Sequence, residues 1–197
     1  MDIVLASNNK HKIAELEAFM QKYCADVRVL SLSDIGYDKE IIVDGNSFEE
    51  NALIKARTIA SLGYTAVADD SGLMVDALDG APGIYSARYA GEPCDNDRNN
   101  EKLLENLKDV EWEKRTAKFV SVIACVFPDG KYFLSKGECP GIITRDFRGE
   151  RGFGYDPLFY YEPSGKTFAE MTAVEKNEIS HRARSMQKFA ETFVKEI

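Results

Sequence analysis

Two adjacent carboxylates, Asp69 and Asp70, follow an apolar run at residues 65–68 and precede Ser71 and Gly72. Neighbouring carboxylates beside a buried strand repel one another unless a cation or hydrogen-bond donors neutralise them. Hard divalent ions such as Mg²⁺ take oxygen ligands of this kind, and one carboxylate can bind the metal while another accepts a proton from water. Asp and Gly are also ordinary turn formers, so the segment can simply end a strand. Taken alone, the turn is the favoured interpretation.

A second polar segment is suited to an anion. The apolar run at residues 3–6 leads into a polar turn and the start of a helix, made of Ser7, Asn8, Asn9, Lys10, His11 and Lys12. Free backbone N–H groups and the positive end of the helix dipole favour an anion there, and the two lysines add charge. The alternative is a solvated first turn capped by Ser7 or Asn8, because no glycine-rich phosphate fingerprint is present. The segment alone supports both equally.

A glycine-rich aromatic turn is predicted at residues 152–157. Glycines such as Gly154 let the backbone approach a flat ligand closely, and the rings of Phe153 and Tyr155 can stack on a base. The backbone or Asp156 can then read the edge of that base. A surface turn with both rings tucked into the core is the comparable alternative.

The last predicted helix carries Lys176, Ser180, His181 and Arg182. Lys176 in the first turn opposes the helix dipole, and Arg182 borders the apolar stripe, where a cation needs an anion. His181 is one of only two histidines. Such a residue is more often structural and partly buried, yet with Arg182 it can donate hydrogen bonds to the keto oxygens of a purine or to phosphate.

The segment at residues 80–89 is punctuated by glycine and proline and carries Arg88. Its arginine can meet a phosphate or the acidic pair, but such segments are more often turns. Each cluster is a weak signal by itself. Together they are the parts of a metal–nucleotide site.

Helices and strands alternate around these groups. Capping boxes at Ser47-x-x-Glu50 and Thr172-x-x-Glu175 predict a helix that stops near Gly63 and a last helix with an apolar stripe through Phe193. Strands are predicted at residues 3–6, 65–68 and 119–127, with a turn at 128–130 and an antiparallel return at 132–134. Interleaved strands and helices with one hairpin predict an α/β protein with a mixed sheet.

The length of 197 residues and the 44% hydrophobic content predict a single domain over residues 1–197. No apolar run is long enough to cross a bilayer, and the first residues lack the pattern of a signal peptide, so we expect a soluble, cytoplasmic protein without a membrane partner. Four scattered cysteines are expected to be buried or incidental thiols rather than zinc ligands. A net charge of −8 argues against nucleic-acid binding but allows a small anionic substrate.

Six ordered blocks resemble the inosine/xanthosine triphosphate pyrophosphatases, the Ham1-like family. They are SNNKHK at 7–12, FEENALIKAR at 48–57, ADDSGL at 68–73, GAPGIYSARY at 80–89, GFGYDP at 152–157 and SHR at 180–182. The resemblance spans nearly the whole chain. It implies Mg²⁺-dependent conversion of dITP, ITP and XTP to the monophosphate and pyrophosphate. It also implies an elongated, two-lobed fold with the site in a central cleft, and a homodimer.

The resemblance also implies roles for individual residues. Asp70 resembles the general base and metal-associated carboxylate, and Asp69 supports it at the metal. Residues 7–12 resemble the triphosphate-binding turn, joined by Lys55, Ser71 and Lys176. Phe153, Gly154, Tyr155 and Asp156 resemble the base-binding turn, while His181 and Arg182 resemble the base-recognition pair.

One position departs from the family pattern. Many relatives carry a metal-serving glutamate two residues before the glycine that precedes the Thr/Ser-Phe helix start, and this chain has Val43 there. Glu40 or Asp44 are substitutes that align less cleanly, so the metal shell is left open. Two other functions stay open as well: a pyrophosphatase for other modified nucleotides, and a non-catalytic nucleotide sensor.

Overall fold

The computed structural model describes all residues, Met1–Ile197, and contains one seven-stranded sheet in the order β2-β1-β3-β4-β5-β6-β7. Its pairings are both parallel and antiparallel, which confirms the predicted α/β class with a mixed sheet. The strands are β1 (Asp2–Leu5), β2 (Arg28–Leu30), β3 (Ala66–Val75), β4 (Thr116–Val126), β5 (Tyr132–Ile143), β6 (Phe159–Tyr161) and β7 (Lys166–Thr167). The α-helices are α1 (Lys10–Met20), α2 (Phe48–Ala60), α3 (Asn96–Asn106), α4 (Ala173–Ile179) and α5 (His181–Glu196).

The chain divides into two compact units. The first unit contains Met1–Asp70, Ser121–Gly137 and Arg184–Ile197, and the second contains Ser71–Val120 and Glu138–Ala183. Each has an apolar core of its own. No helix is long and apolar enough to span a membrane.

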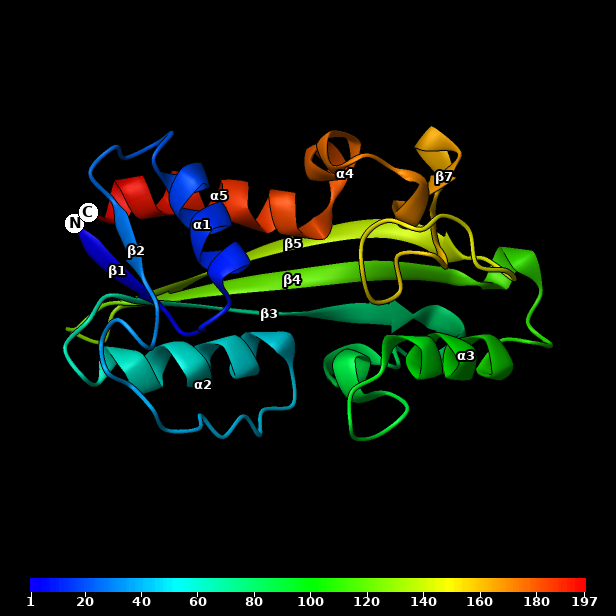
Figure 1. Cartoon of the computed structure of the whole chain (residues 1–197), viewed down its shortest axis with the longest axis horizontal. Coiled ribbons are helices and arrows are strands. Elements are labelled where there is room, and N and C mark those ends of the chain that lie inside the picture. The colour runs from blue at the N-terminus through cyan, green and yellow to red at the C-terminus, as the bar shows by residue number, and fades with distance from the viewer. The chain divides into compact units, whose positions relative to one another are not determined.

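The first unit is organised around the parallel strands β1, β2 and β3. Helices α1 and α2 lie on opposite sides of this part of the sheet (Figure 1). The N-terminus of α2 is capped as the sequence predicts, since the Ser47 hydroxyl accepts a hydrogen bond from the Glu50 backbone N–H at 3.1 Å. The core of the unit packs β1 against α1 and the apolar face of α5. Both helices that follow β1 and precede β3 are therefore anchored on the sheet.

The two aspartates lie inside a strand, not at its end. The prediction placed the end of the strand at residue 68, but β3 continues through Asp69, Asp70, Ser71 and Gly72 to Val75. The prediction was wrong because Asp, Ser and Gly are turn formers, whereas here ladder pairing and the buried residues beyond them hold an extended backbone. Consecutive side chains of a strand point to opposite faces, so the two carboxylates diverge.

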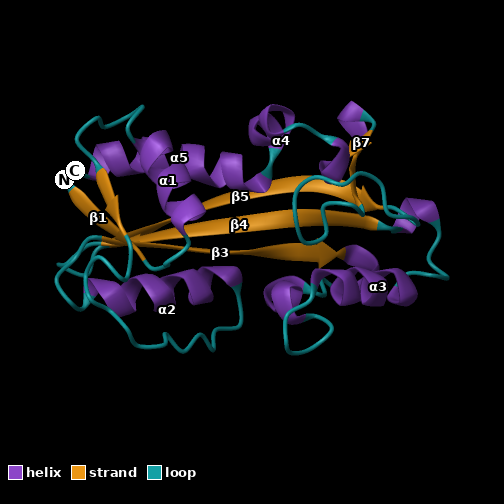
Figure 2. Ribbon diagram, viewed as in Figure 1, coloured by secondary structure: helices purple, strands orange, loops and turns teal.

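The predicted hairpin is present. Strands β4 and β5 are neighbours in the sheet and are joined by a turn in which the Phe127 N–H donates to the Lys131 carbonyl at 2.8 Å. Both strands are longer than expected. In the second unit the sheet continues with antiparallel β6 and β7, and Figure 2 shows the loops that separate these short strands from α4.

The single helix predicted after residue 172 is two helices. α4 ends at Ile179, and Ser180 adopts an extended conformation with ψ 155° before α5 begins at His181. The Ser180 hydroxyl accepts a hydrogen bond from the Ala183 N–H at 3.2 Å and so starts the second helix. No glycine or proline marks this break. Serine is tolerated inside a helix, so the spacing of apolar residues does not show that Ser180 ends one helix and caps the next.

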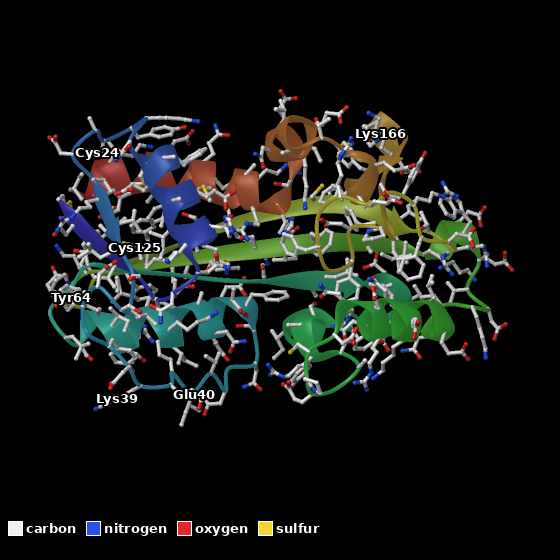
Figure 3. The ribbon with its side chains drawn as sticks, viewed as in Figure 1. Cys24, Lys39, Glu40, Tyr64, Cys125 and Lys166 are labelled. Carbon is white, nitrogen blue, oxygen red and sulfur yellow. The ribbon has the colours of Figure 1, made fainter.

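All four cysteines are free thiols: Cys125 and Cys139 are buried, Cys24 is half-buried and Cys94 is exposed. Figure 3 shows Cys24 and Cys125 within the first unit. Burial raises the pKa of Cys125 to about 12, so its thiol is protonated and inert at neutral pH.

Candidate functional site

Asp70 is held by two side chains of α2. The Lys55 ammonium donates to Asp70 Oδ1 at 3.1 Å, and the Asn51 amide Nδ2 donates to Asp70 Oδ2 at 3.2 Å. Asn51 and Lys55 are four residues apart and therefore share one face of the helix. Each carboxylate oxygen thus has one donor and keeps a lone pair. The side chains of Asp70 and Lys55 are 21% and 20% exposed, so water reaches them.

Asp69 is bound from the other helix. The Lys12 ammonium of α1 lies 2.7 Å from Asp69 Oδ2, while Lys55 donates to the Asp69 backbone carbonyl at 2.6 Å. This follows from the position of the aspartates within β3, because α1 and α2 cover opposite sides of the sheet (Figure 1). We call Lys12, Asn51, Lys55, Asp69 and Asp70 the carboxylate cluster.

The polar turn after β1 is an internally hydrogen-bonded structure. The cap of α1 is Asn9, not Ser7 or Asn8, and its Oδ1 accepts from the backbone N–H groups of His11 and Lys12. The Ser7 hydroxyl accepts from the Asn9 N–H at 3.1 Å. Because these donors are already engaged, the groups left facing solvent at the helix start are the side chains of Lys10 and His11.

The same turn is braced from the loop after β2. Asn8 Oδ1 accepts hydrogen bonds from both the backbone N–H and the hydroxyl of Ser33, at 2.8 and 2.9 Å. The Asn8 side chain therefore positions the turn. Ser71, which was grouped with this turn, is an exposed residue of β3.

The aromatic turn at residues 152–157 lies in the second unit and is organised by Asp156. Asp156 Oδ2 accepts from the Phe153 backbone N–H at 3.0 Å and from the Lys176 ammonium at 2.5 Å. Gly152 makes room for this carboxylate, since a Cβ there would lie 2.0 Å from Asp156 Oδ2. The Lys176 ammonium also lies 5.0 Å from the centre of the Phe153 ring, which is 65% exposed. The Lys176 ammonium thus contacts the aromatic turn, and it also lies 5.4 Å from the centre of the Phe168 ring.

Two buried asparagines of α3 hold backbone groups around the aromatic turn: Asn100 bonds the turn itself, and Asn99 bonds the segment that contacts Tyr155. Asn100 Nδ2 donates to the Gly154 carbonyl at 2.9 Å, and Asn99 Nδ2 donates to the Ala87 carbonyl at 2.9 Å. The Tyr155 hydroxyl donates to the Ser86 carbonyl at 2.6 Å. Tyr155 is therefore buried and structural, whereas Phe153 presents its ring to solvent. Sequence reasoning missed both asparagines, because polar residues on a helix are usually solvated.

His181 is a buried, neutral imidazole. Burial, followed by the nearby charges of Arg182 and Lys176, lowers its pKa to about 3. Its ring stacks on Phe119 with the centroids 4.8 Å apart, and its Nδ1 has no hydrogen-bond partner. A neutral imidazole carries one donor and one acceptor nitrogen. Arg182, the next residue, is half-buried.

The two carboxylates of the carboxylate cluster, Asp69 and Asp70, are chemically suited to a hard cation. Carboxylate oxygens are ligands that Mg²⁺ takes, usually one or two of them together with water and substrate phosphates. No group of three His, Cys, Asp or Glu side chains is arranged to hold a metal by itself. Val43 is half-buried, while Glu40 and Asp44 are exposed; Figure 3 shows Glu40 on the loop before α2.

Comparison with known proteins identifies the family. The model of the Ham1 family matches residues 3–192. This chain belongs to the Ham1 family. A dITP/XTP pyrophosphatase of Leuconostoc mesenteroides is 50% identical to this Ham1-family chain over 189 residues, which cover 95% of this chain and 94% of the relative. A dITP/XTP pyrophosphatase of Clostridium perfringens is 46% identical over 94% of this chain and 93% of the relative.

Solved structures of the family share the fold of this Ham1-family chain. The Staphylococcus aureus Ham1 protein superposes with a TM-score of 0.93 at 40% identity, covering 100% of both chains. A nucleoside-triphosphatase/dITP/XTP pyrophosphatase of Mycobacterium abscessus gives a TM-score of 0.84 at 43% identity, over 96% of this chain and 98% of the other.

The structure brings the expected residues of this Ham1-family chain together in two groups. The carboxylate cluster joins Lys12, Lys55, Asp69 and Asp70 in the first unit. Phe153, Asp156 and Lys176 form contacts in the second unit. Asn51 is the member of the carboxylate cluster that sequence reasoning missed. Its position four residues before Lys55 was the available signal.

Proposed function

We propose that this Ham1-family chain is a nucleoside triphosphate pyrophosphatase that converts dITP, ITP and XTP to the monophosphate and pyrophosphate, and so removes deaminated purine nucleotides from the precursor pool. The observation that carries this proposal is the near-full-length similarity to dITP/XTP pyrophosphatases, at 50% identity in one case. The carboxylate cluster supports it, since it joins carboxylates and ammonium groups where water has access.

We assign the triphosphate to the first unit. Lys10, Lys12 and Lys55 supply positive charge, and residues 7–12 supply the turn before α1 together with the first residues of that helix. Mg²⁺ held by Asp70, with Asp69 in support, would neutralise phosphate charge and polarise the phosphoryl oxygens when bound. Asp70 takes the principal role because the family resemblance assigns it the base, and its contacts with Lys55 and Asn51, at 3.1 and 3.2 Å, are longer than the 2.7 Å contact between Asp69 and Lys12.

Asp70 acts as the general base in this mechanism. Its carboxylate takes a proton from a water molecule as the water oxygen attacks the α-phosphorus. The bond from that phosphorus to the oxygen bridging to the β-phosphorus breaks, and pyrophosphate leaves with the electron pair. Lys12 and Lys55 stabilise the charge in transfer. Lys55 also orients the Asp70 carboxylate by its contact at 3.1 Å.

We assign the base to the second unit. The exposed Phe153 ring offers a stacking surface, while Gly154 and Asp156 shape the turn beside it. His181 and Arg182 are the proposed donors to the 6-keto oxygen. Adenine carries an amino group at that position, so these donors would be left unpaired, at a cost of about 1–3 kcal/mol for each buried group.

The decisive experiment is a pyrophosphate-release assay with dITP, ITP, XTP, GTP, ATP and dTTP, with and without Mg²⁺. We expect turnover of the first three that requires the metal, and a fall of about 100-fold or more in Asp70→Asn while nucleotide binding persists. Preference for dTTP would favour a pyrophosphatase for other modified nucleotides. Binding without turnover by the unmodified protein would favour a nucleotide sensor.

The family resemblance also motivates a homodimer. We propose that two copies associate in solution, and light scattering after size-exclusion chromatography should give twice the chain mass of 22.1 kDa. A monomer at micromolar concentration would contradict this.

A further inference from the structure

Asn51 has no role in the mechanism above, yet it touches the proposed general base. We propose that Asn51 is a positioning residue that sets the orientation of the Asp70 carboxylate. This inference rests on the proposed function, because it concerns the group that accepts the proton from water.

The geometry gives Asp70 one donor on each oxygen. Lys55 holds Oδ1 at 3.1 Å and Asn51 holds Oδ2 at 3.2 Å. A single contact would leave the carboxylate free to rotate about its bond to Cβ. Two donors from one helix face fix the plane of the group and therefore the direction of its remaining lone pairs. The lysine is a charged partner with several roles, whereas the asparagine contributes orientation alone.

The other end of the Asn51 amide shows that this contact does not serve stability. Asn51 is 6% exposed, and its Oδ1 is buried without a hydrogen-bond partner. A buried unsatisfied carbonyl destabilises a fold. Rotating the amide by half a turn would direct that oxygen at the Asp70 carboxylate, where two acceptors repel. The amide orientation is thus fixed by Asp70 at the expense of its own carbonyl, as is common for residues placed for function.

The loop before α2 is shaped to admit this side chain. A Cβ at Gly45 would lie 2.5 Å from Asn51 Oδ1 and 2.8 Å from Glu50 Cβ. The backbone of Gly45 is outside the left-handed region, so alanine is tolerated there by the backbone and excluded by the neighbouring side chains. Gly45→Ala is therefore a second way to displace Asn51 without changing its chemistry.

The principal test is Asn51→Leu, which keeps the volume and removes the amide. We expect kcat for dITP to fall roughly 10- to 100-fold with KM changed by less than about twofold, because orientation of a base acts in the transition state. Since the buried carbonyl is removed as well, Tm should stay unchanged or rise. Gly45→Ala should lower kcat in the same direction by a smaller factor. Ile59→Val, in the buried face of the same helix, is the matched control and should leave kcat unchanged.

A double-mutant cycle separates positioning from a general structural effect. In the Asp70→Asn background, Asn51→Leu should have no further effect on the residual rate, because its influence passes through Asp70. Equal losses with and without Asp70 would overturn the inference, as would full kcat in Asn51→Leu. If Asn51→Leu does not fold, Gly45→Ala in the same two backgrounds decides the question. Failure of the proposed function is distinct, since the unmodified protein would then not release pyrophosphate from dITP, and full turnover in Asp70→Asn would refute the base role alone.

Discussion

Two lysine–aspartate pairs with the same chemistry occupy different environments in the two units. In the first unit, Lys55 and Asp70 have side chains that are 20% and 21% exposed. In the second, Lys176 is 20% exposed but Asp156 only 4%. Asp70 is thus reachable by water, whereas Asp156 is enclosed and bonded to the backbone N–H of its own turn.

The Lys55–Asp70 pair is open to water and ligands, whereas the Lys176–Asp156 pair holds the aromatic turn in one conformation. Burial raises the pKa of Asp156 in spite of the opposing effects of Lys176 and the Phe153 N–H. A buried carboxylate of this kind depends on its cation, because water cannot replace it. Water and substrate phosphates can reach the Lys55–Asp70 pair, so a ligand can approach this carboxylate while its donors hold it. The first environment suits chemistry and the second suits recognition of a rigid shape.

The most direct test of this difference is to replace the lysine of each pair with methionine. Lys55→Met should lower turnover of dITP about 100-fold, since a donor near transferring charge is lost, and should lower Tm by only a few degrees. Lys176→Met should instead lower stability by about 3 kcal/mol, because it leaves Asp156 buried without its cation. Steady-state kinetics and thermal melts on both variants make the measurement.

A third lysine, in an exposed ion pair, serves as the reference for these changes in stability. Lys166 pairs with Glu175 at 2.7 Å, and both side chains are more than 40% exposed. Lys166→Met should therefore leave Tm nearly unchanged. If Lys176→Met is as mild as Lys166→Met, the second pair is not the fixed element that its burial indicates.

An intermediate effect is expected from Gly152→Ala. Gly152 has a φ of +76°, and a Cβ there would displace the Asp156 carboxylate that closes the aromatic turn. We expect KM for dITP to rise roughly tenfold with a smaller change in kcat, because the turn is assigned to binding the base. Gly91→Ala is the control, since Gly91 has a φ of +97° and open space around it. If KM rose equally in both variants, backbone strain alone would explain the effect of Gly152→Ala.

The smallest effect concerns pH and stability. The pKa of His181 is lowered to about 3 in the folded protein, while an unfolded histidine titrates near 6.5. Between these values the unfolded chain binds the extra proton, so acidification below about pH 6.5 destabilises the native state, by up to ~1.4 kcal/mol per pH unit. The loss of Tm between pH 7 and pH 5 should be smaller in His181→Phe, which keeps the stack on Phe119. The raised pKa of Asp156 acts in the opposite direction but is common to both proteins. Identical pH dependence in the two proteins would contradict a neutral His181.

The sequence was sufficient for features that depend on local signals. The Ser47 cap, the hairpin around residues 127–131 and the mixed sheet follow from capping residues, turn chemistry and the spacing of apolar residues. The family blocks also named Asp70 and Lys55 as site residues, but the contact between them was not predicted. These signals are carried by residues close together in the chain.

Features set by tertiary contacts could not be predicted in this way. Residues 69–72 have the composition of a turn, but packing and ladder pairing hold them in β3. Ser180 gives no sign of the break between α4 and α5. Asn51, Asn99 and Asn100 look like solvated helix residues, and only the fold shows that they are buried against a carboxylate or backbone carbonyls. For the aspartates and the asparagines the deciding partner is distant in sequence, whereas Ser180 caps α5 through the nearby Ala183 N–H.

Because the backbone is extended at Asp69 and Asp70, the side chains of these two identical neighbours point to opposite faces of the sheet. The Asp69 side chain faces α1 and the Asp70 side chain faces α2, so Lys12 and Lys55 each pair with a single carboxylate. Deleting Ala68 alone would exchange the two faces and turn each aspartate toward the other helix, while deleting both Val67 and Ala68 would preserve the faces and shift the register. Which lysine each aspartate contacts is thus set by the position of that aspartate along the strand, because the two side chains are chemically identical.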